Sequence, residues 1–277
     1  MVRLFASVYR NSARSDPPMS GWSAFRHVTA PASRLQAWGC DRIEGERAVK
    51  PLLAPLTASL GAIATGASIL DIGCGGGHLL VSLAASHRSW TLTGIDSNLD
   101  QVRRACLRGT RFGDRFAAIQ GSAGELPFAS GSFDVVVSIT SIKHWPDQET
   151  GLREAMRVLR PDGRYFVAEV HRSGADADSQ EFVRSLGVPT VLRRPASTLF
   201  RKFVLGAGWR PHDADGLATS LGLANSEVVS LSSPPLVVLA RTKRRSPPGP
   251  YPRSGFSYAD HESNRRYFRG EGDEGNC

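Results

Sequence analysis

The chain has 277 residues, a formal net charge of +8 and 41% apolar residues, which is enough for one large or two modest packed domains. No apolar run approaches the roughly 20 residues that cross a bilayer, so a membrane-spanning protein is not expected. The four cysteines show no C-x-x-C pair and no histidine at metal-ligand spacing, so we expect free thiols and no metal site. Free thiols indicate a reducing compartment, and we expect a cytoplasmic protein.

The positive charge is concentrated at the two ends of the chain. Residues 1–36 contain five Arg and one Asp, which gives +4, and residues 241–277 contain eight Lys and Arg against five Asp and Glu, which gives +3. The part between them carries only +1. A domain that grips phosphates is expected to carry the excess charge itself, so a nucleic-acid partner is disfavoured.

Both ends are expected to lie outside the folded domain, which we place at residues 37–242. Residues 1–36 lack sustained apolar periodicity and are predicted to be a flexible extension, and residues 243–277 are predicted to be a disordered tail. Residues 1–15 are rich in Arg and Ser and contain no acid, so an organelle-targeting segment is an alternative, as is a true start at Met19. Residues 36–60 predict one or two short helices.

A glycine-dense turn follows the first predicted strand. Residues 69–77 read Ile-Leu-Asp-Ile-Gly-Cys-Gly-Gly-Gly, and apolar residues at helical spacing come next, which predicts a strand, a tight turn and a helix. Alternate glycines can adopt positive φ and leave bare backbone for a ligand. These glycines are Gly73, Gly75 and Gly77. A dinucleotide fingerprint, Gly-x-Gly-x-x-Gly, does not fit, because neither register places a glycine at its last position.

The pattern that is present, Asp-x-Gly-x-Gly-x-Gly, resembles motif I of the class I S-adenosylmethionine-dependent methyltransferases. In that family the glycine turn underlies the methionine part of the cofactor, and the acid, here Asp71, helps to hold its amino end. From this stretch alone, a glycine-rich loop in an unrelated α/β protein is the alternative.

A second strand, residues 91–96, ends in Asp96, which follows Asp71 by the length of one βα unit and a strand. A carboxylate at this end can accept hydrogen bonds from both ribose hydroxyls, because it offers two oxygens. The alternative is a solvated carboxylate at a strand end. Ser97 and Asp100 predict a capping box at the start of the next helix.

The third strand, residues 116–120, precedes Gly-Ser-Ala-Gly-Glu-Leu-Pro-Phe. This segment resembles the family's loop Asp-Ala-x-x-Leu-Pro-Phe, whose acid accepts a hydrogen bond from the adenine amino group. Ser122 stands in the place of that acid, and a hydroxyl is a weaker acceptor than a carboxylate. Adenine recognition is therefore expected to depend on the Ala123 backbone and apolar packing.

Residues 131–139 form a turn and a β-branched run, which predicts a fourth strand buried on both faces. Ser138, near its end, is expected to line the cofactor site. A helix that includes residues 152–159 stops at the following Arg-Pro-Asp-Gly, and residues 165–170 form the fifth strand. This phrase also resembles the family, and the order of four motifs is more specific than any one of them.

Alternating strands and helices predict an α/β fold, a Rossmann-like, doubly wound and mostly parallel seven-stranded sheet. A helix over residues 213–223 and strands over 227–231 and 236–240 fit the antiparallel C-terminal hairpin of the family. In such sheets, ligands bind at the carboxyl ends of the strands. Candidate residues fall at or near those ends: Asp71, Asp96, Ser122, Ser138 and Glu169.

Methyl transfer from a sulfonium is a displacement at an activated carbon, so the protein mainly positions the acceptor and excludes water. The candidate base is His144, on the turn after the fourth strand, with a packing role as the alternative. Glu169 and His171, at the end of the fifth strand, are candidates to bind or deprotonate the acceptor, or are simply solvated. Residues 172–212 predict two amphipathic helices that cap an apolar acceptor, or ordinary packing helices.

Together these features predict an S-adenosylmethionine-dependent methyltransferase that acts on a small molecule, and the chain resembles the ubiquinone/menaquinone-methyltransferase-like type of the family. No Asn/Asp-Pro-Pro-Tyr tetrapeptide follows the fourth strand, which argues against N-methylation of adenine or glutamine. No acidic metal cluster is visible, which argues against a magnesium-dependent catechol enzyme. The alternatives are an RNA methyltransferase that uses its basic tails and a non-catalytic S-adenosylmethionine-binding partner protein. The sequence makes no prediction of the oligomeric state.

Overall fold

The computed structural model describes residues 52–53, 56–57, 63–172, 176–185, 187–203, 208–223, 226–232 and 235–241. Seven strands form one sheet in the order β3-β2-β1-β4-β5-β7-β6. The strands are β1 (Ser68–Ile72), β2 (Thr91–Asp96), β3 (Phe116–Gln120), β4 (Phe133–Ile139), β5 (Leu159–Val170), β6 (Ser226–Ser232) and β7 (Pro235–Arg241). The first five strands run parallel, whereas β7 is antiparallel to both β5 and β6. The predicted fold class is therefore confirmed, including the C-terminal hairpin.

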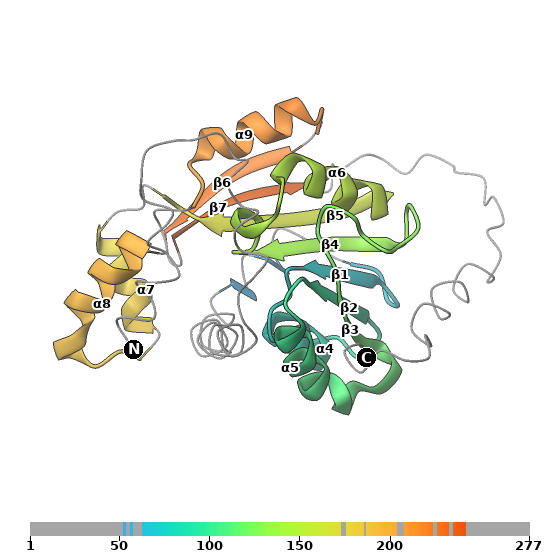
Figure 1. Ribbon diagram of the computed structural model, residues 1–277, viewed down its shortest axis with the longest axis horizontal. Coiled ribbons are helices and arrows are strands. Elements are labelled where there is room, and N and C mark those ends of the chain that lie inside the picture. The colour runs from blue at the N-terminus through green and yellow to red at the C-terminus, as the bar shows by residue number, and fades with distance from the viewer. Residues whose placement is uncertain are drawn as a thin grey trace.

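Helices cover both faces of this sheet (Figure 1). They are α4 (His78–Ser86), α5 (Leu99–Gly109), α6 (Gln148–Val158), α7 (Asp176–Ser185), α8 (Thr190–Phe203) and α9 (Pro211–Ser220), with short 3₁₀ helices η3 (Thr110–Arg115) and η4 (Ile142–His144). Strand β1 shows how the alternation of side chains divides the core. Ile69 packs in one apolar cluster with α4 and α5, whereas Leu70 and Ile72 pack in the other with α6 and α9.

The ends of several elements differ from the prediction. Helix α6 stops at Val158 and β5 begins at Leu159, six residues before the predicted strand. Leu159 is already paired with Phe133 of β4, and a shift of register before Val135 absorbs the Pro-Asp-Gly turn. The cap of α5 is also different: the side chain of Asn98, not Ser97, accepts hydrogen bonds from the first backbone N–H groups.

The two helices predicted within residues 172–212 are present as α7 and α8. In Figure 1 both lie at the left, beyond the ends toward which the β4 and β5 arrows point. Because those are the carboxyl ends of parallel strands, the pair stands at the ligand-binding edge of the sheet. Its role as a cap over the acceptor remains a prediction.

Other predictions lie wholly or mostly outside the described residues, namely the N-terminal extension, the C-terminal tail and most of residues 36–60. Among the cysteines, Cys74 is a free thiol as expected. The expectation is wrong for Cys106, which is disulfide-bonded.

Candidate active site

The glycine turn between β1 and α4 has the left-handed backbone that the sequence predicts. Gly73, Gly75 and Gly77 have φ values of 77°, 51° and 77°. At Gly73 the need for glycine is steric as well, because an added Cβ would lie 2.4 Å from both Cβ and Oγ of Ser141. The turn therefore passes directly against the segment that follows β4, and a side chain on Gly73 would separate the two.

The backbone N–H groups of this turn are largely used within the protein. Gly73 and Cys74 donate to the carbonyl oxygen of Ile95, at 2.7 Å and 3.1 Å. Gly75 donates to Oδ2 of Asp96 at 2.9 Å. No side chain caps the N-terminus of α4, where His78 begins the helix. A ligand would thus meet bare glycine backbone and the first turn of α4, rather than a ring of free turn amides.

Asp96 lies at the predicted place, at the carboxyl end of β2. Its second oxygen, Oδ1, accepts a 2.8 Å hydrogen bond from the backbone N–H of Asn98. Burial raises the pKa of this carboxyl, and its two backbone donors offset part of that rise. Each carboxylate oxygen has a second lone pair, so Asp96 can still accept from two ribose hydroxyls while it holds the turn.

Asp71 is buried near the end of β1. Burial and the nearby Asp96 carboxylate raise the pKa of Asp71 from its ordinary 3.8 to about 8. In the unliganded protein Asp71 is therefore mostly protonated at pH 7. A cationic amino group at this place would reverse the balance, because it favours the ionised carboxylate.

The predicted adenine loop is held by α6. Ser122 Oγ accepts a 3.2 Å hydrogen bond from Gly124 N, so this hydroxyl already stabilises its own turn. Ala123 is buried in the apolar cluster on the α6 side of the sheet. Arg157, on α6, donates to the carbonyl oxygens of Leu126 and Phe128 at 2.9 Å and 2.7 Å. Glu154, also on α6, accepts from Leu126 N at 2.9 Å, so these two side chains fix the backbone of this loop.

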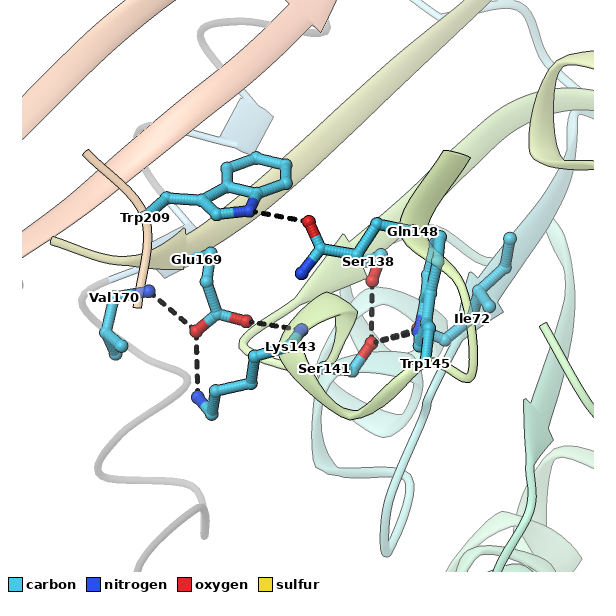
Figure 2. A network of polar contacts seen from close by, with 9 residues as sticks. All are labelled: Ile72, Ser138, Ser141, Lys143, Trp145, Gln148, Glu169, Val170 and Trp209. Atoms are coloured by element: carbon cyan, nitrogen blue, oxygen red, sulfur yellow. Dashed lines mark hydrogen bonds and ion pairs between the residues drawn. The ribbon is translucent and has the colours of Figure 1, made fainter. Parts of the chain in front are cut away.

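Ser141 is the centre of a hydrogen-bond network that sequence reasoning did not single out (Figure 2). Its hydroxyl donates to the carbonyl oxygen of Ile72 at 2.8 Å and accepts from Trp145 Nε1 at 3.1 Å. Ser138 Oγ lies 2.7 Å away, and because the Ser141 proton is already used, Ser138 is the donor. Ser138 is fully buried, which favours a structural role over the predicted contact with cofactor.

His144, the predicted base, ends η4 on the turn after β4. Its protein surroundings and the adjacent Lys143 ammonium lower the pKa of the imidazole from 6.5 to about 3. The side chain is nevertheless exposed, and water in contact with the ring offsets part of this desolvation. The imidazole is neutral at pH 7 and can accept a proton, but it is a weaker base than an ordinary histidine.

Glu169 lies at the end of β5 and is fully buried. Oε1 accepts from Lys143 Nζ and Val170 N, both at 2.8 Å, and Oε2 accepts from Lys143 N at 3.2 Å. Figure 2 shows these contacts beside the Ser141 network. A carboxylate with three donors is poorly placed to take a proton from an acceptor. His171 follows β5 and is partly exposed, and its backbone pairs with Trp209.

Lys143, Gln148 and Trp209 are further members of this region that the sequence did not reveal. Trp209 Nε1 donates to Gln148 Oε1 at 3.1 Å, so the segment before α9 is tied to the start of α6. This bond joins residues 61 positions apart, and the Lys143–Glu169 pair joins residues 26 positions apart. Only the adjacency of β4 and β5 in the sheet brings them together, and no local pattern signals it.

Comparisons with known proteins agree with this geometry. The model of a family described as a methyltransferase domain matches residues 70–167. That range contains the glycine turn, Asp96, the predicted adenine loop and His144. Residues 70–167 are therefore similar to a methyltransferase domain.

Relatives of this methyltransferase domain carry related names. A 27-O-demethylrifamycin SV methyltransferase from Amycolatopsis mediterranei is 38% identical over 128 residues, which cover 44% of this chain and 46% of that protein. A ubiquinone biosynthesis O-methyltransferase from Pseudomonas paraeruginosa is 29% identical over 177 residues, or 62% and 70% of the two chains. The chain thus spans about half the length of the first of these relatives.

The fold of the methyltransferase domain also matches solved structures. A protein of Methanococcus maripaludis, described as an S-adenosyl-L-methionine-dependent methyltransferase, superposes with a TM-score of 0.57 at 16% identity. The match covers 84% of this chain and 98% of that one. At this identity the likeness concerns the fold alone.

The residues of the methyltransferase domain fit the cofactor that its family implies. The glycine turn presents bare backbone at positive φ, Asp96 retains free lone pairs, and Asp71 is a buried acid that a cationic amine would ionise. Within the described ranges, no group of three or more His, Cys, Asp or Glu residues could hold a metal ion. In those same ranges, no helix is long and apolar enough to cross a membrane.

Proposed function

We propose that the chain transfers the methyl group of S-adenosylmethionine to an oxygen atom of a small-molecule acceptor. The bond from Gly75 to Asp96 carries this proposal, because it joins the glycine turn to the acid of the next strand. These are the two elements that the family uses for the methionine and ribose parts of its cofactor. Both lie within the matched residues 70–167.

Each predicted binding residue has one part of the cofactor to hold. When bound, S-adenosylmethionine supplies an activated methyl carbon. Asp71 and the glycine turn hold the methionine end, and Asp96 accepts from the ribose hydroxyls. Ser122 and Ala123 form the edge of the adenine pocket. Because the Ser122 hydroxyl accepts from Gly124 N, adenine recognition here depends mainly on backbone and apolar contacts.

Oxygen is the proposed acceptor atom because the relatives' names refer to O-methylation. The lowered pKa of His144 indicates which kind of hydroxyl group suits the site. A neutral imidazole with a lowered pKa takes a proton readily only from an acidic hydroxyl, so a phenol or an enol suits this site better than an alkyl alcohol. The first turn of α8 exposes Val191 and Leu192, which supports an apolar acceptor or cap at this edge.

Turnover of labelled cofactor tests the proposal. The purified chain is incubated with methyl-labelled S-adenosylmethionine and a panel of phenols, enols, alcohols and amines, and products are identified by mass spectrometry. We expect label on oxygen of an acidic hydroxyl, lost in Asp96→Ala and reduced by roughly 10²- to 10⁴-fold in His144→Gln. Label on nitrogen or carbon would contradict oxygen transfer, and the absence of any product would favour the non-catalytic alternative.

The partner and location predictions need their own tests. If RNA were the acceptor, deletion of residues 1–36 and 243–277 would abolish RNA binding and its salt dependence. We expect this deletion to leave small-molecule turnover unchanged. A cytoplasmic location remains a prediction, which fractionation of cells that express the tagged chain can check.

A further inference from the structure

The turn between β4 and α6 is held in an unfavourable backbone conformation. Thr140 has a φ of 55°, the only positive φ of a non-glycine residue among those that the structure describes. A β-branched residue in the left-handed region is an outlier that persists only where surrounding contacts determine it. Thr140 begins the turn that carries His144, so the contacts that hold this turn also place the candidate base.

One set of these contacts comes from β5. Glu169 binds Lys143 twice, through the backbone N–H and through Nζ, so it fixes both the main chain and the side chain of the residue next to His144. The exposed fractions of these two side chains are 6% for Lys143 and 0% for Glu169. A buried ion pair of this kind is strongly coupled, because removal of one partner leaves an uncompensated charge.

A second set of contacts anchors the other side of the turn. Ser141 donates to the Ile72 carbonyl oxygen on β1 and accepts from Trp145, as Figure 2 shows. The backbone N–H of His144 donates to the Ser141 carbonyl oxygen at 2.8 Å. His144 therefore lies between two anchored neighbours.

We propose that the buried Lys143–Glu169 pair is a positioning device, which holds the turn between β4 and α6 and so places the His144 imidazole toward the methyl acceptor. This inference rests on the proposed function for its catalytic consequence. It changes the role of Glu169 from a candidate base to a positioning residue. Lys143, which no sequence motif singled out, becomes its partner.

The pair also acts on His144 through charge. On the elements that meet at this turn, the described residues include the charged groups Lys143 itself, Glu169 at the end of β5 and Asp147 at the start of α6. Desolvation is the larger cause of the lowered pKa of His144, and the Lys143 ammonium adds to it by repulsion of the imidazolium. Replacement of Lys143 by an uncharged residue should therefore raise this pKa. If turnover needs neutral His144, the pH below which kcat falls should then move upward.

The test combines variants at both positions with a readout that does not require turnover. Lys143→Met and Glu169→Gln break the pair singly, and Lys143→Met with Glu169→Met replaces it by two apolar side chains of similar length, which buried pairs often tolerate without loss of folding. Arg153→Met is the matched control, because Arg153 forms an exposed ion pair with Glu149 on α6. Isotope-labelled imidazole NMR reports the His144 pKa, with His144→Gln to assign its signal.

We expect Lys143→Met and the double variant to raise the His144 pKa and to lower kcat by roughly 10- to 100-fold, the scale of a misplaced catalytic group, with the KM for cofactor nearly unchanged. Arg153→Met should match the wild type. A folded double variant with the wild-type His144 pKa and kcat would overturn the proposal. If the wild type has no turnover, Glu169→Gln still tests the positioning role by NMR, because it loosens the turn and keeps the Lys143 charge. A His144 ring signal at the wild-type chemical shift in this variant would overturn the proposal, whereas a shifted or broadened signal would support it and leave only the proposed function to fail.

Discussion

The backbone N–H of Gly75 donates a 2.9 Å hydrogen bond to Oδ2 of Asp96. This contact joins the glycine turn after β1 to the end of β2, two segments 21 positions apart in the chain. Asp96 therefore shapes the turn in addition to its proposed contact with the ribose. A substitution at this position should affect both.

We expect Asp96→Ala to weaken the binding of S-adenosylhomocysteine by about 1–3 kcal/mol, the cost of losing a hydrogen-bonded carboxylate. Isothermal titration calorimetry measures the change. Asp114→Ala, which removes an exposed carboxylate from η3, should leave the affinity unchanged. Equal affinities of Asp96→Ala and wild type would reject the ribose role.

Gly73→Ala should destabilise the protein by about 2–5 kcal/mol, because it combines positive φ with a Cβ that collides with Ser141. Gly66→Ala is the matched control. Its φ is 80°, but nothing lies within 4 Å of the added Cβ, so only the backbone cost of about 1–2 kcal/mol applies. Urea unfolding compares the two. Similar losses at both positions would show that Ser141 does not press against the turn.

Asp71 should make the stability of the unliganded protein depend on pH. Its pKa is raised to about 8, so between pH 3.8 and about 8 the folded state holds a proton that the unfolded state releases. This contribution is fully present at low pH and is lost as the pH rises through about 8. The melting temperature of Asp71→Asn minus that of the wild type should therefore increase as the pH rises.

Thermal melts between about pH 5 and pH 8 measure this difference, with Asp114→Asn as a control that should show no trend. Cofactor binding offers a second measurement. If the cationic amino group ionises Asp71, titrations in buffers of different ionisation enthalpy should report the release of about one proton at pH 7. A flat difference in melting temperature would show that Asp71 is ionised in the free protein.

Arg157→Ala should release the adenine loop from α6. The substitution removes the side-chain donor from the carbonyl oxygens of Leu126 and Phe128, although Leu126 O still accepts from Phe128 N, and we expect a loss of about 1–2 kcal/mol in stability together with weaker cofactor binding. Arg153→Ala, one turn earlier on the same helix, breaks only an exposed pair with Glu149 and should cost at most about 0.5 kcal/mol. If Arg157→Ala binds the cofactor with the wild-type affinity, the conformation of the loop does not depend on Arg157.

The sequence predicts the elements of this fold well because their signals are local. The β-branched run of β4 and the glycines of the first turn determine their own conformation. The predictions are wrong at element ends whose position depends on contacts that the local sequence does not show. Leu159 enters β5 because it pairs with Phe133, and Asn98 rather than Ser97 caps α5 because its side chain reaches the first N–H groups.

The candidate site divides in the same way. Asp71 and Asp96 follow from motif spacing, since a strand end places each of them at the sheet edge. The pairing of Glu169 with Lys143 and the contacts of Ser141 do not, because they join residues on different strands. The sequence pattern of a polar residue at a strand end is the same whether its side chain contacts the methyl acceptor or is buried in an ion pair.

Calorimetric titration of S-adenosylhomocysteine into the folded wild-type chain tests the central claim most directly. We predict saturable binding at one site, weakened about 5- to 150-fold in Asp96→Ala, which corresponds to the loss of about 1–3 kcal/mol. A protein that melts cooperatively, and so is folded, yet binds neither S-adenosylhomocysteine nor S-adenosylmethionine would contradict it.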